Sequence, residues 1–292
     1  MRSGLVAVAG RPNVGKSTLV NALAGGKVAI VSDKPQTTRR RISAVVDGRL
    51  EDEPFQLVLV DLPGFQRPRD ALTERMQRTV DEAFDDVDGV LFVLAADERI
   101  GAGDRFIAER VFGREPPVVL ALNKVDRATP GAIAEQIDRA AALGDFHALH
   151  PVSALTGDGV EALRTELTGL LPEGPRYFEE GRRTDLPVEA QIGEIVREKA
   201  LQVTREEVPH AISVEVDELD ANAGRVSAHV WVETESQKGI VVGKGGAMIR
   251  TIGTRARPEI ESLLGRPVFL DLRVKVRPRW RRDEGALERL GI

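Results

Sequence analysis

The chain has 292 residues, more than a single hydrophobic core usually serves, so two domains are expected. With 42% apolar and 30% charged residues it has the composition of a globular protein, and the absence of cysteine excludes disulfides, thiolate metal sites and thiol nucleophiles. We expect a cytoplasmic protein, because the start lacks a signal-peptide pattern and no run of about eighteen apolar residues could span a membrane.

The net charge of −5 hides an asymmetry along the chain. Residues 237–292 contain 13 basic and 6 acidic side chains, a local charge of +7, whereas the preceding residues carry −12. Opposite signs in two segments predict a basic module for a polyanion, attached to an acidic body. A solvated charged helix face is the alternative interpretation.

Up to about residue 171, short apolar runs alternate with helical patterns. The runs expected as buried strands are 5–10, 55–64, 89–97, 117–124 and 148–154, and the helical segments between them are 16–25, 71–84, 103–113, 130–143 and 159–171. Alternation of this kind predicts an α/β fold with a doubly wound, mostly parallel sheet. Ligands of such sheets bind at the carboxyl ends of the strands.

Proline, glycine and charged residues interrupt this alternation at 172–187, and the order of elements then changes. A helix (188–204), two alternating strands (210–219 and 224–236), a short helix, a glycine loop, a longer helix (245–264) and a last strand (267–276) predict a smaller α+β domain. We therefore expect domains at 1–172 and 188–292, joined by a linker at 173–187.

The stretch GRPNVGKS matches the phosphate-loop pattern G-x-x-x-x-G-K-[S/T] directly after a predicted strand and before a helix. Its backbone N–H groups would surround phosphates, Lys16 would neutralise the β- and γ-phosphates, and Ser17 would bind Mg²⁺. The residues predicted to bind nucleotide here are Gly10, Arg11, Pro12, Asn13, Val14, Gly15, Lys16, Ser17 and Thr18.

The sequence LALNKVD follows another buried run and places Asn123, Lys124 and Asp126 at the end of a strand. A carboxylate at Asp126 can accept hydrogen bonds from the ring N–H and the amino group of guanine, and adenine offers neither arrangement. After the last predicted strand, Ser153, Ala154 and Leu155 can supply a backbone N–H to the guanine oxygen. GTP and GDP are therefore the predicted nucleotides.

Two segments between these motifs predict sensing of the γ-phosphate. Asp61 would hold Mg²⁺ through water, and the Gly64 N–H would meet the γ-phosphate. Thr37 and Thr38 each offer a hydroxyl to Mg²⁺, so residues 32–40 and 64–70 are expected to change with nucleotide state. No side chain is an obvious general base, so catalysis would consist mainly of positioning and charge stabilisation.

The second glycine loop, Gly243, Lys244, Gly245 and Gly246, lacks the hydroxyl residue and the spacing of a phosphate loop. It fits the KH signature, in which a GxxG loop between two helices clamps the sugar–phosphate backbone of single-stranded RNA or DNA. The apolar neighbours Ile240, Val242, Ile249 and Ile252 would form the floor of the groove. Candidate phosphate or base contacts, with a solvated helix face as the alternative, are Arg250, Arg255, Arg257 and Lys275.

The order GRPNVGKS, QTTR, DLPG, NKVD and SAL, followed by the KH signature, resembles the Era family of ribosome-assembly GTPases over the whole chain. The resemblance implies a type II KH domain and favours Thr38 over Thr37 as the metal threonine. It also implies a hydrophobic residue, here Phe65, at the position where Ras-like GTPases place a glutamine that orients the attacking water. Gln66, one residue further on, would be a poor substitute for that glutamine. K⁺ binding by Asn13 is a hypothesis taken from related GTPases.

By the same resemblance, the RNA would be the 3′ end of small-subunit ribosomal RNA, and the partner a 30S-type subunit whose maturation the protein assists. A monomer is expected, with peripheral contact to the inner face of the cell membrane left open. The competing hypothesis is a GTPase whose second domain docks a protein or a membrane surface. Trp280, among arginines near the C-terminus, is more typical of packing than of RNA stacking or membrane contact.

Overall fold

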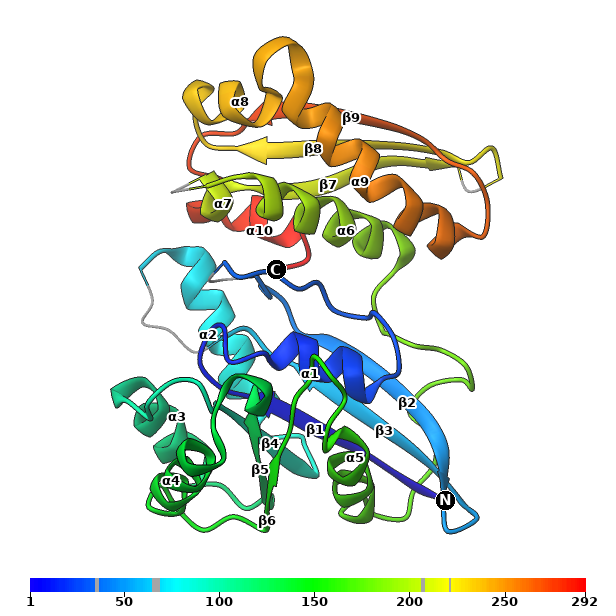
Figure 1. Ribbon diagram of the computed structural model, residues 1–292. Helices are drawn as coiled ribbons and strands as arrows, with labels where there is room; N and C mark the ends of the chain where they lie inside the picture. The colour runs from blue at the N-terminus through cyan, green and yellow to red at the C-terminus, as the bar shows by residue number, and fades with distance from the viewer. Residues whose placement is uncertain (35–36, 65–68, 206–207, 221) are drawn as a thin grey trace. The chain divides into compact units, whose positions relative to one another are not determined.

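The structure is a computed structural model that describes residues 1–34, 37–64, 69–205, 208–220 and 222–292. These residues form two compact units (Figure 1). The first comprises the described residues within 1–29, 38–67 and 75–185, and the second those within 30–37, 68–74 and 186–292. In the described part, no helix is long and apolar enough to cross a membrane.

The first unit is built on a sheet with strand order β2-β3-β1-β4-β5-β6 in its described part. Its strands are β1 (Arg2–Ala9), β2 (Ile42–Leu50), β3 (Glu53–Asp61), β4 (Gly89–Ala95), β5 (Val118–Asn123) and β6 (Ala148–Pro151). All neighbouring pairs are parallel except β2 with β3, which confirms the predicted doubly wound, mostly parallel sheet.

Strand β2 was not predicted. It forms a hairpin with β3 through Glu51 and Asp52, whose φ angles of 48° and 68° are those of a tight two-residue hairpin turn. Such turns usually carry Asn-Gly or Asp-Gly, so Glu-Asp gave no turn signal in the sequence.

Helices cover both faces of this sheet (Figure 1). They are α1 (Lys16–Leu23), α2 (Ala71–Ala83), α3 (Ala102–Val111), α4 (Pro130–Ala141) and α5 (Val160–Gly169), with a short 3₁₀ turn η1 (Val125–Arg127). Alternate residues of β1 pack on opposite faces: Val6 and Val8 join the cluster with α1 and α5, and Ala7 and Ala9 join the cluster with α2, α3 and α4. Both faces are apolar because both are covered.

The stretch expected as a linker lies along the first unit as far as Asp185. The side-chain oxygen of Gln56 on β3 accepts hydrogen bonds from the N–H groups of Tyr177 and Phe178, at 2.8 and 2.9 Å. Asp185 accepts bonds from the N–H and the hydroxyl of Ser43 on β2, at 3.0 and 2.8 Å. The proline, glycine and charged residues thus marked the point at which the order of elements changes. The stretch itself makes hydrogen bonds to β2 and β3 of the first sheet.

The second unit places helices on a sheet of order β7-β8-β9, antiparallel between β7 and β8 and parallel between β8 and β9. Ile192 and Val196 of α6 and Ile252 and Ile260 of α9 pack in one core with the strands. The elements are α6 (Val188–Val203), α7 (Val208–Ala211), β7 (Ser213–Asp220), β8 (Arg225–Val232), α8 (Glu235–Val242), η2 (Lys244–Gly246), α9 (Ala247–Leu264), β9 (Phe269–Val276), η3 (Trp280–Arg282) and α10 (Glu284–Arg289).

Trp280 is a packing residue, as its favoured interpretation stated. Its side chain is 0% exposed, and its Nε1–H donates to the carbonyl oxygen of Ala211 at 2.9 Å. A buried indole with a satisfied N–H stacks on no RNA base and inserts into no membrane surface. The short helices α7 and α10 that flank this contact were not predicted.

Candidate functional site

The phosphate loop connects β1 to α1 and lies against the strand that ends in the guanine motif. Gly15 has φ 95°, and a Cβ built there would lie 2.3 Å from Nδ2 of Asn123, so only glycine fits. The same Nδ2 donates to the carbonyl oxygen of Val14 at 2.9 Å. The two motifs, more than a hundred residues apart in the sequence, are therefore in direct contact.

Lys16 lies in the interior of this loop and is 7% exposed. Its Nζ donates to the carbonyl oxygens of Gly10 and Arg11, at 2.9 and 3.0 Å. Burial lowers the pKa of Lys16 to about 8, although the charge of Asp61 acts in the opposite direction. An amine held in this way is ready to exchange two neutral carbonyls for anionic phosphate oxygens.

Three oxygen-bearing side chains converge beside Lys16. Ser17 Oγ donates to Asp61 Oδ2 at 2.7 Å and lies 3.0 Å from Thr38 Oγ1, which lies 3.4 Å from the same carboxylate oxygen. Burial raises the pKa of Asp61, opposed by the charge of Lys16 and by the hydroxyl hydrogen bonds. Its other oxygen, Oδ1, is buried without a hydrogen-bond partner. This set of oxygens, one of them unpartnered, fits Mg²⁺.

The two candidate threonines lie in different surroundings. Thr38 belongs to the first unit and is 7% exposed beside Ser17. Thr37 belongs to the second unit, where its hydroxyl donates to the carbonyl oxygen of Lys34 at 2.6 Å and its own carbonyl accepts a hydrogen bond from Arg197 of α6. The geometry therefore agrees with Thr38 as the metal threonine. Phe65 and Gln66 lie outside the described residues.

The guanine motif forms around the end of β5. Asp126 accepts a hydrogen bond of 2.6 Å from the hydroxyl of Ser153, which is fully buried. Asn123 Oδ1 accepts the N–H of Ala154 at 3.0 Å, and Leu155 follows with 73% of its surface exposed. The structure thus brings the predicted NKVD and SAL segments together at the carboxyl ends of β5 and β6.

Gly64, the residue expected to meet the γ-phosphate, lies beside the phosphate loop, since a Cβ there would meet Pro12 at 3.0 Å.

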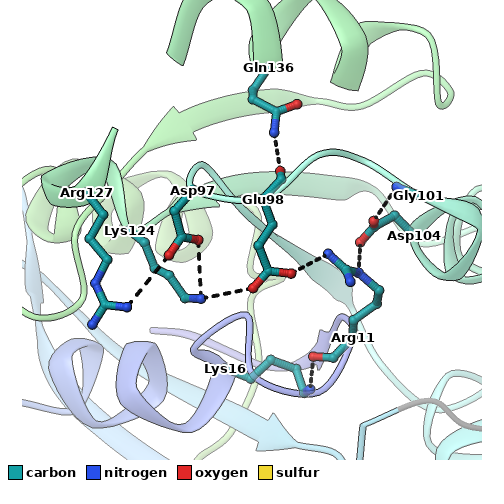
Figure 2. Close-up of polar contacts among 9 residues, drawn as sticks. All are labelled: Arg11, Lys16, Asp97, Glu98, Gly101, Asp104, Lys124, Arg127 and Gln136. Carbon is teal, nitrogen blue, oxygen red and sulfur yellow. Dashed lines mark hydrogen bonds and ion pairs between the residues drawn. The ribbon is translucent and has the colours of Figure 1, made fainter. Parts of the chain in front are cut away.

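A charged network, shown in Figure 2, joins the phosphate loop to the guanine motif. Glu98 Oε2 lies 3.1 Å from Arg11 Nη2, and Oε1 of the same carboxylate lies 3.6 Å from Lys124 Nζ. Asp97 Oδ1 lies 3.3 Å from the same Nζ, and Asp104 Oδ1 accepts a 2.7 Å bond from Arg11 Nε. Burial alone would lower the pKa of Arg11, but the hydrogen bond and charge of Asp104, with Glu98, raise it.

Sequence reasoning missed the acidic members of this network. Asp97 and Glu98 directly follow the buried strand β4, at the same edge of the sheet as the other motifs. Two adjacent carboxylates at that position were the available signal. Among the described residues, this network included, no group of three or more His, Asp or Glu side chains could hold a metal ion.

The second glycine loop separates α8 from α9, as predicted. Gly243, Gly245 and Gly246 all have positive φ angles, of 73°, 59° and 77°. A Cβ at Gly243 would lie 2.8 Å from the backbone nitrogen of Met248, so a side chain there would distort the loop itself. A Cβ at Gly245 or Gly246 would have no neighbouring atom within 4 Å, and the side chain of Lys244 is exposed.

The apolar residues predicted as a groove floor divide into two groups. Ile240 is 46% exposed, and Val242 and Ile249 are partly exposed. Ile252 is 0% exposed and packs in the core of the second unit, so its assignment to the groove floor is wrong. Position 252 lies on the face of α9 that meets the sheet, whereas Ile249 lies three residues earlier, near the rim of that face.

The predicted basic contacts do not share one face. Arg250 and Arg257 are seven residues apart on α9 and lie within roughly 20° around the helix, whereas Arg255 lies roughly 140° from Arg250. A Cβ at Gly253 would lie 3.6 Å from Leu272 of β9, so Gly253 marks the side of α9 that faces this strand. Arg250 is nearer to that side than Arg255 is. Lys275 alternates with the core residues Val274 and Val276, so it points to the opposite face of the sheet from the helices.

Comparison with known families and proteins agrees with both loops. A family of 50S ribosome-binding GTPases matches residues 5–124, and the KH domain family matches residues 207–281. GTPase Era of a Nocardioides species is 47% identical over 100% of this chain and 96% of its own length. GTPase Era of Mycolicibacterium paratuberculosis is 45% identical over 100% of this chain and 99% of its own.

Solved structures agree over the full length. A variant of Aquifex aeolicus Era bound to GDP and AlF4⁻ is 38% identical, with a TM-score of 0.94 over 100% of this chain and 99% of that one. Era in complex with MgGDPNP and nucleotides 1506–1542 of 16S ribosomal RNA gives a TM-score of 0.92 at the same identity and coverage. With a phosphate loop, a guanine motif and a GxxG loop in place, the chain belongs to the Era family of GTP-hydrolysing proteins.

Proposed function

We propose that this chain is a GTP-operated switch that binds the 3′ end of small-subunit ribosomal RNA and assists the maturation of that subunit. The observation that carries the proposal is the presence of two different phosphate-recognising loops in one chain. The first has a lysine, a hydroxyl and a buried carboxylate around a metal position. The second has three glycines with positive φ and an exposed lysine, without a metal position.

In the first loop, we assign Lys16 to the β- and γ-phosphates, and Ser17 and Thr38 to Mg²⁺, with Asp61 acting through water. Mg²⁺ supplies charge neutralisation of the phosphates when bound. Asp126 and the Ser153–Leu155 stretch recognise guanine, and Gly64 senses the γ-phosphate. These side chains hold and orient the nucleotide, so hydrolysis proceeds by positioning of an attacking water and by charge stabilisation.

In the second loop, we assign the sugar–phosphate backbone of RNA to residues 243–246. Ile240, Val242 and Ile249 are exposed enough to lie against bases, and the exposed Arg250 and Arg257 share a side of α9 that is nearer to β9 than Arg255 is. Arg255 and Lys275 point elsewhere and would contact only RNA that extends beyond the groove. Trp280 is buried, so it is not available for contact with a membrane.

The wider proposal places the protein in the cytoplasm as a monomer that meets a 30S-type subunit. The domain limits stay a prediction: a GTPase domain at 1–172, a linker at 173–187 and a KH domain at 188–292. The hypothesis that Asn13 helps bind K⁺ is supported by its position in the phosphate loop, where it is exposed.

The RNA clamp is tested by filter binding of a single-stranded RNA from the 3′ end of 16S ribosomal RNA. The variant Lys244→Asp/Gly245→Asp should lose binding and keep GTP hydrolysis, because both positions face open space and aspartate tolerates the φ of 59° at residue 245. Gly243→Asp would be a poorer choice, since it collides with the Met248 backbone.

A matched change, Arg164→Asp/Thr165→Asp on α5, lowers the net charge by the same three units at partly and fully exposed positions and should bind as the parent does. Equal RNA binding by the loop variant and the parent would contradict the clamp assignment. Binding of the parent to anionic vesicles or protein, with none to RNA, would favour the docking hypothesis instead.

A further inference from the structure

Asp97 and Glu98 lie where strand β4 meets the guanine motif. Ala95 pairs with Asn123 in the parallel register of β4 and β5, and the N–H of Ala96 donates to the carbonyl oxygen of Asn123 at 2.7 Å. Asp97 and Glu98 follow directly after this backbone contact with the guanine motif. The pairing of β4 with β5 therefore fixes the main-chain position of the two acidic residues.

Glu98 bridges two motifs that are far apart in the sequence (Figure 2). One carboxylate oxygen lies 3.1 Å from Arg11 of the phosphate loop, and the other lies 3.6 Å from Lys124 of the guanine motif. Asp97 adds a second carboxylate oxygen at 3.3 Å from the Lys124 amine. The lysine thus faces two carboxylates, of which Glu98 also contacts the loop that holds the phosphates.

Buried groups hold Glu98 and Arg11 of this bridge in place. Gln136 of α4, which is 5% exposed, donates its side-chain N–H to the main-chain oxygen of Glu98. Arg11 is held from its other side by Asp104, which is 1% exposed and accepts the N–H of Gly101 at 2.8 Å. The bridge therefore connects anchored groups, so little conformational freedom is lost when it forms.

The side chain of Lys124 projects into the acidic pair from a strained backbone position. Its φ of 66° is in the left-handed region, which is strained for a residue other than glycine. A lysine at this position is 18% exposed and directed into the acidic pair. There the amine lies 3.3 Å from an Asp97 oxygen and 3.6 Å from a Glu98 oxygen.

We propose that Glu98, with Asp97, is a positioning residue for the nucleotide: it holds Lys124 of the guanine motif and Arg11 of the phosphate loop at a fixed separation and so slows nucleotide release. The proposal rests on the assignment of Lys124 to the guanine site. Glu98 acts through these two cations and contacts no nucleotide itself.

The test is the dissociation rate of fluorescently labelled GDP from the full chain, measured by stopped flow with excess unlabelled GDP. Glu98→Gln keeps the size of the side chain and removes its charge. We expect roughly three- to tenfold faster release, since Glu98 is 46% exposed and each such ion pair is worth a few-fold. A simple electrostatic effect has the opposite sign, because removing a negative charge beside a polyanion should slow its release.

A matched control is Glu135→Gln, which removes an exposed glutamate paired with Arg139 on α4 and should leave release unchanged. The double-mutant cycle of Glu98→Gln with Lys124→Met should show coupling, with a smaller effect of Glu98→Gln once the lysine is absent. Unchanged or slower release from Glu98→Gln, or independent effects in the cycle, would overturn the proposal. Parent-like GDP affinity of Lys124→Met would instead show that the guanine assignment is wrong.

Discussion

The buried amine of Lys16 predicts that nucleotide binding is accompanied by proton uptake. In the free protein the pKa of Lys16 is lowered to about 8 by burial, with Asp61 opposing the shift. Phosphate oxygens beside the amine favour its charged form, so binding raises this pKa again. Above pH 8, Lys16 is mostly neutral before binding and charged afterwards, and the proton must come from the buffer.

The magnitude follows from the titration of one group with this pKa. Uptake should be about 0.1 proton at pH 7, about 0.5 at pH 8 and about 0.9 at pH 9. Isothermal titration calorimetry of GDP, in two buffers of different ionisation enthalpy, measures it directly. Mg²⁺ is left out so that metal binding adds no proton exchange of its own to the signal. The terminal phosphate of GDP titrates near pH 6, so it contributes little at pH 8 and pH 9, where the uptake by Lys16 is large.

A binding enthalpy that is independent of the buffer at pH 9 would refute this reasoning. It would mean that Lys16 is already charged in the free protein, and that its contacts with the carbonyls of Gly10 and Arg11 outweigh burial. An uptake that stays constant from pH 7 to pH 9 would assign the proton to another group.

Three further predictions concern separate parts of the chain. Asp126→Asn should weaken GTP binding by roughly 100-fold in competition assays and improve binding of XTP, because an amide can donate to the extra carbonyl of xanthine. If Asn13 helps bind K⁺, GTP turnover should be faster in K⁺ than in Na⁺ buffer and Asn13→Gly, which suits the φ of 67°, should lose the difference; equal turnover of the parent in both buffers would exclude it. Trp280→Ala should lower the free energy of unfolding by about 3–5 kcal/mol in urea denaturation, since it empties a fully buried site, and a loss below about 1 kcal/mol would show that the site is not packed.

The elements that bear the nucleotide site could be predicted because their signals are local. A strand buried on both faces is a continuous apolar run, and the phosphate loop and guanine motif each follow such a run. Their contact, through Asn123 and Val14, follows from the rule that parallel strands present their carboxyl ends at one edge.

The features that the sequence did not predict depend on tertiary contacts rather than on local signals. Strand β2 pairs through a turn of Glu51 and Asp52 that has no turn signature. Ile252 matches the apolar pattern around the GxxG loop equally well as groove floor or core, and only packing assigns it to the core. Glu98 acquires its significance from two cations that are distant in the sequence.

The most direct test of the proposed function is crosslinking of the protein to RNA in cells, followed by sequencing. The proposal predicts that reads from the parent chain concentrate at the 3′ end of small-subunit ribosomal RNA and that Lys244→Asp/Gly245→Asp loses them. Lys16→Ala, which removes the phosphate-loop amine, should change their abundance if the nucleotide governs RNA binding. Reads spread over unrelated RNAs, or an unchanged peak in the loop variant, would contradict the proposal.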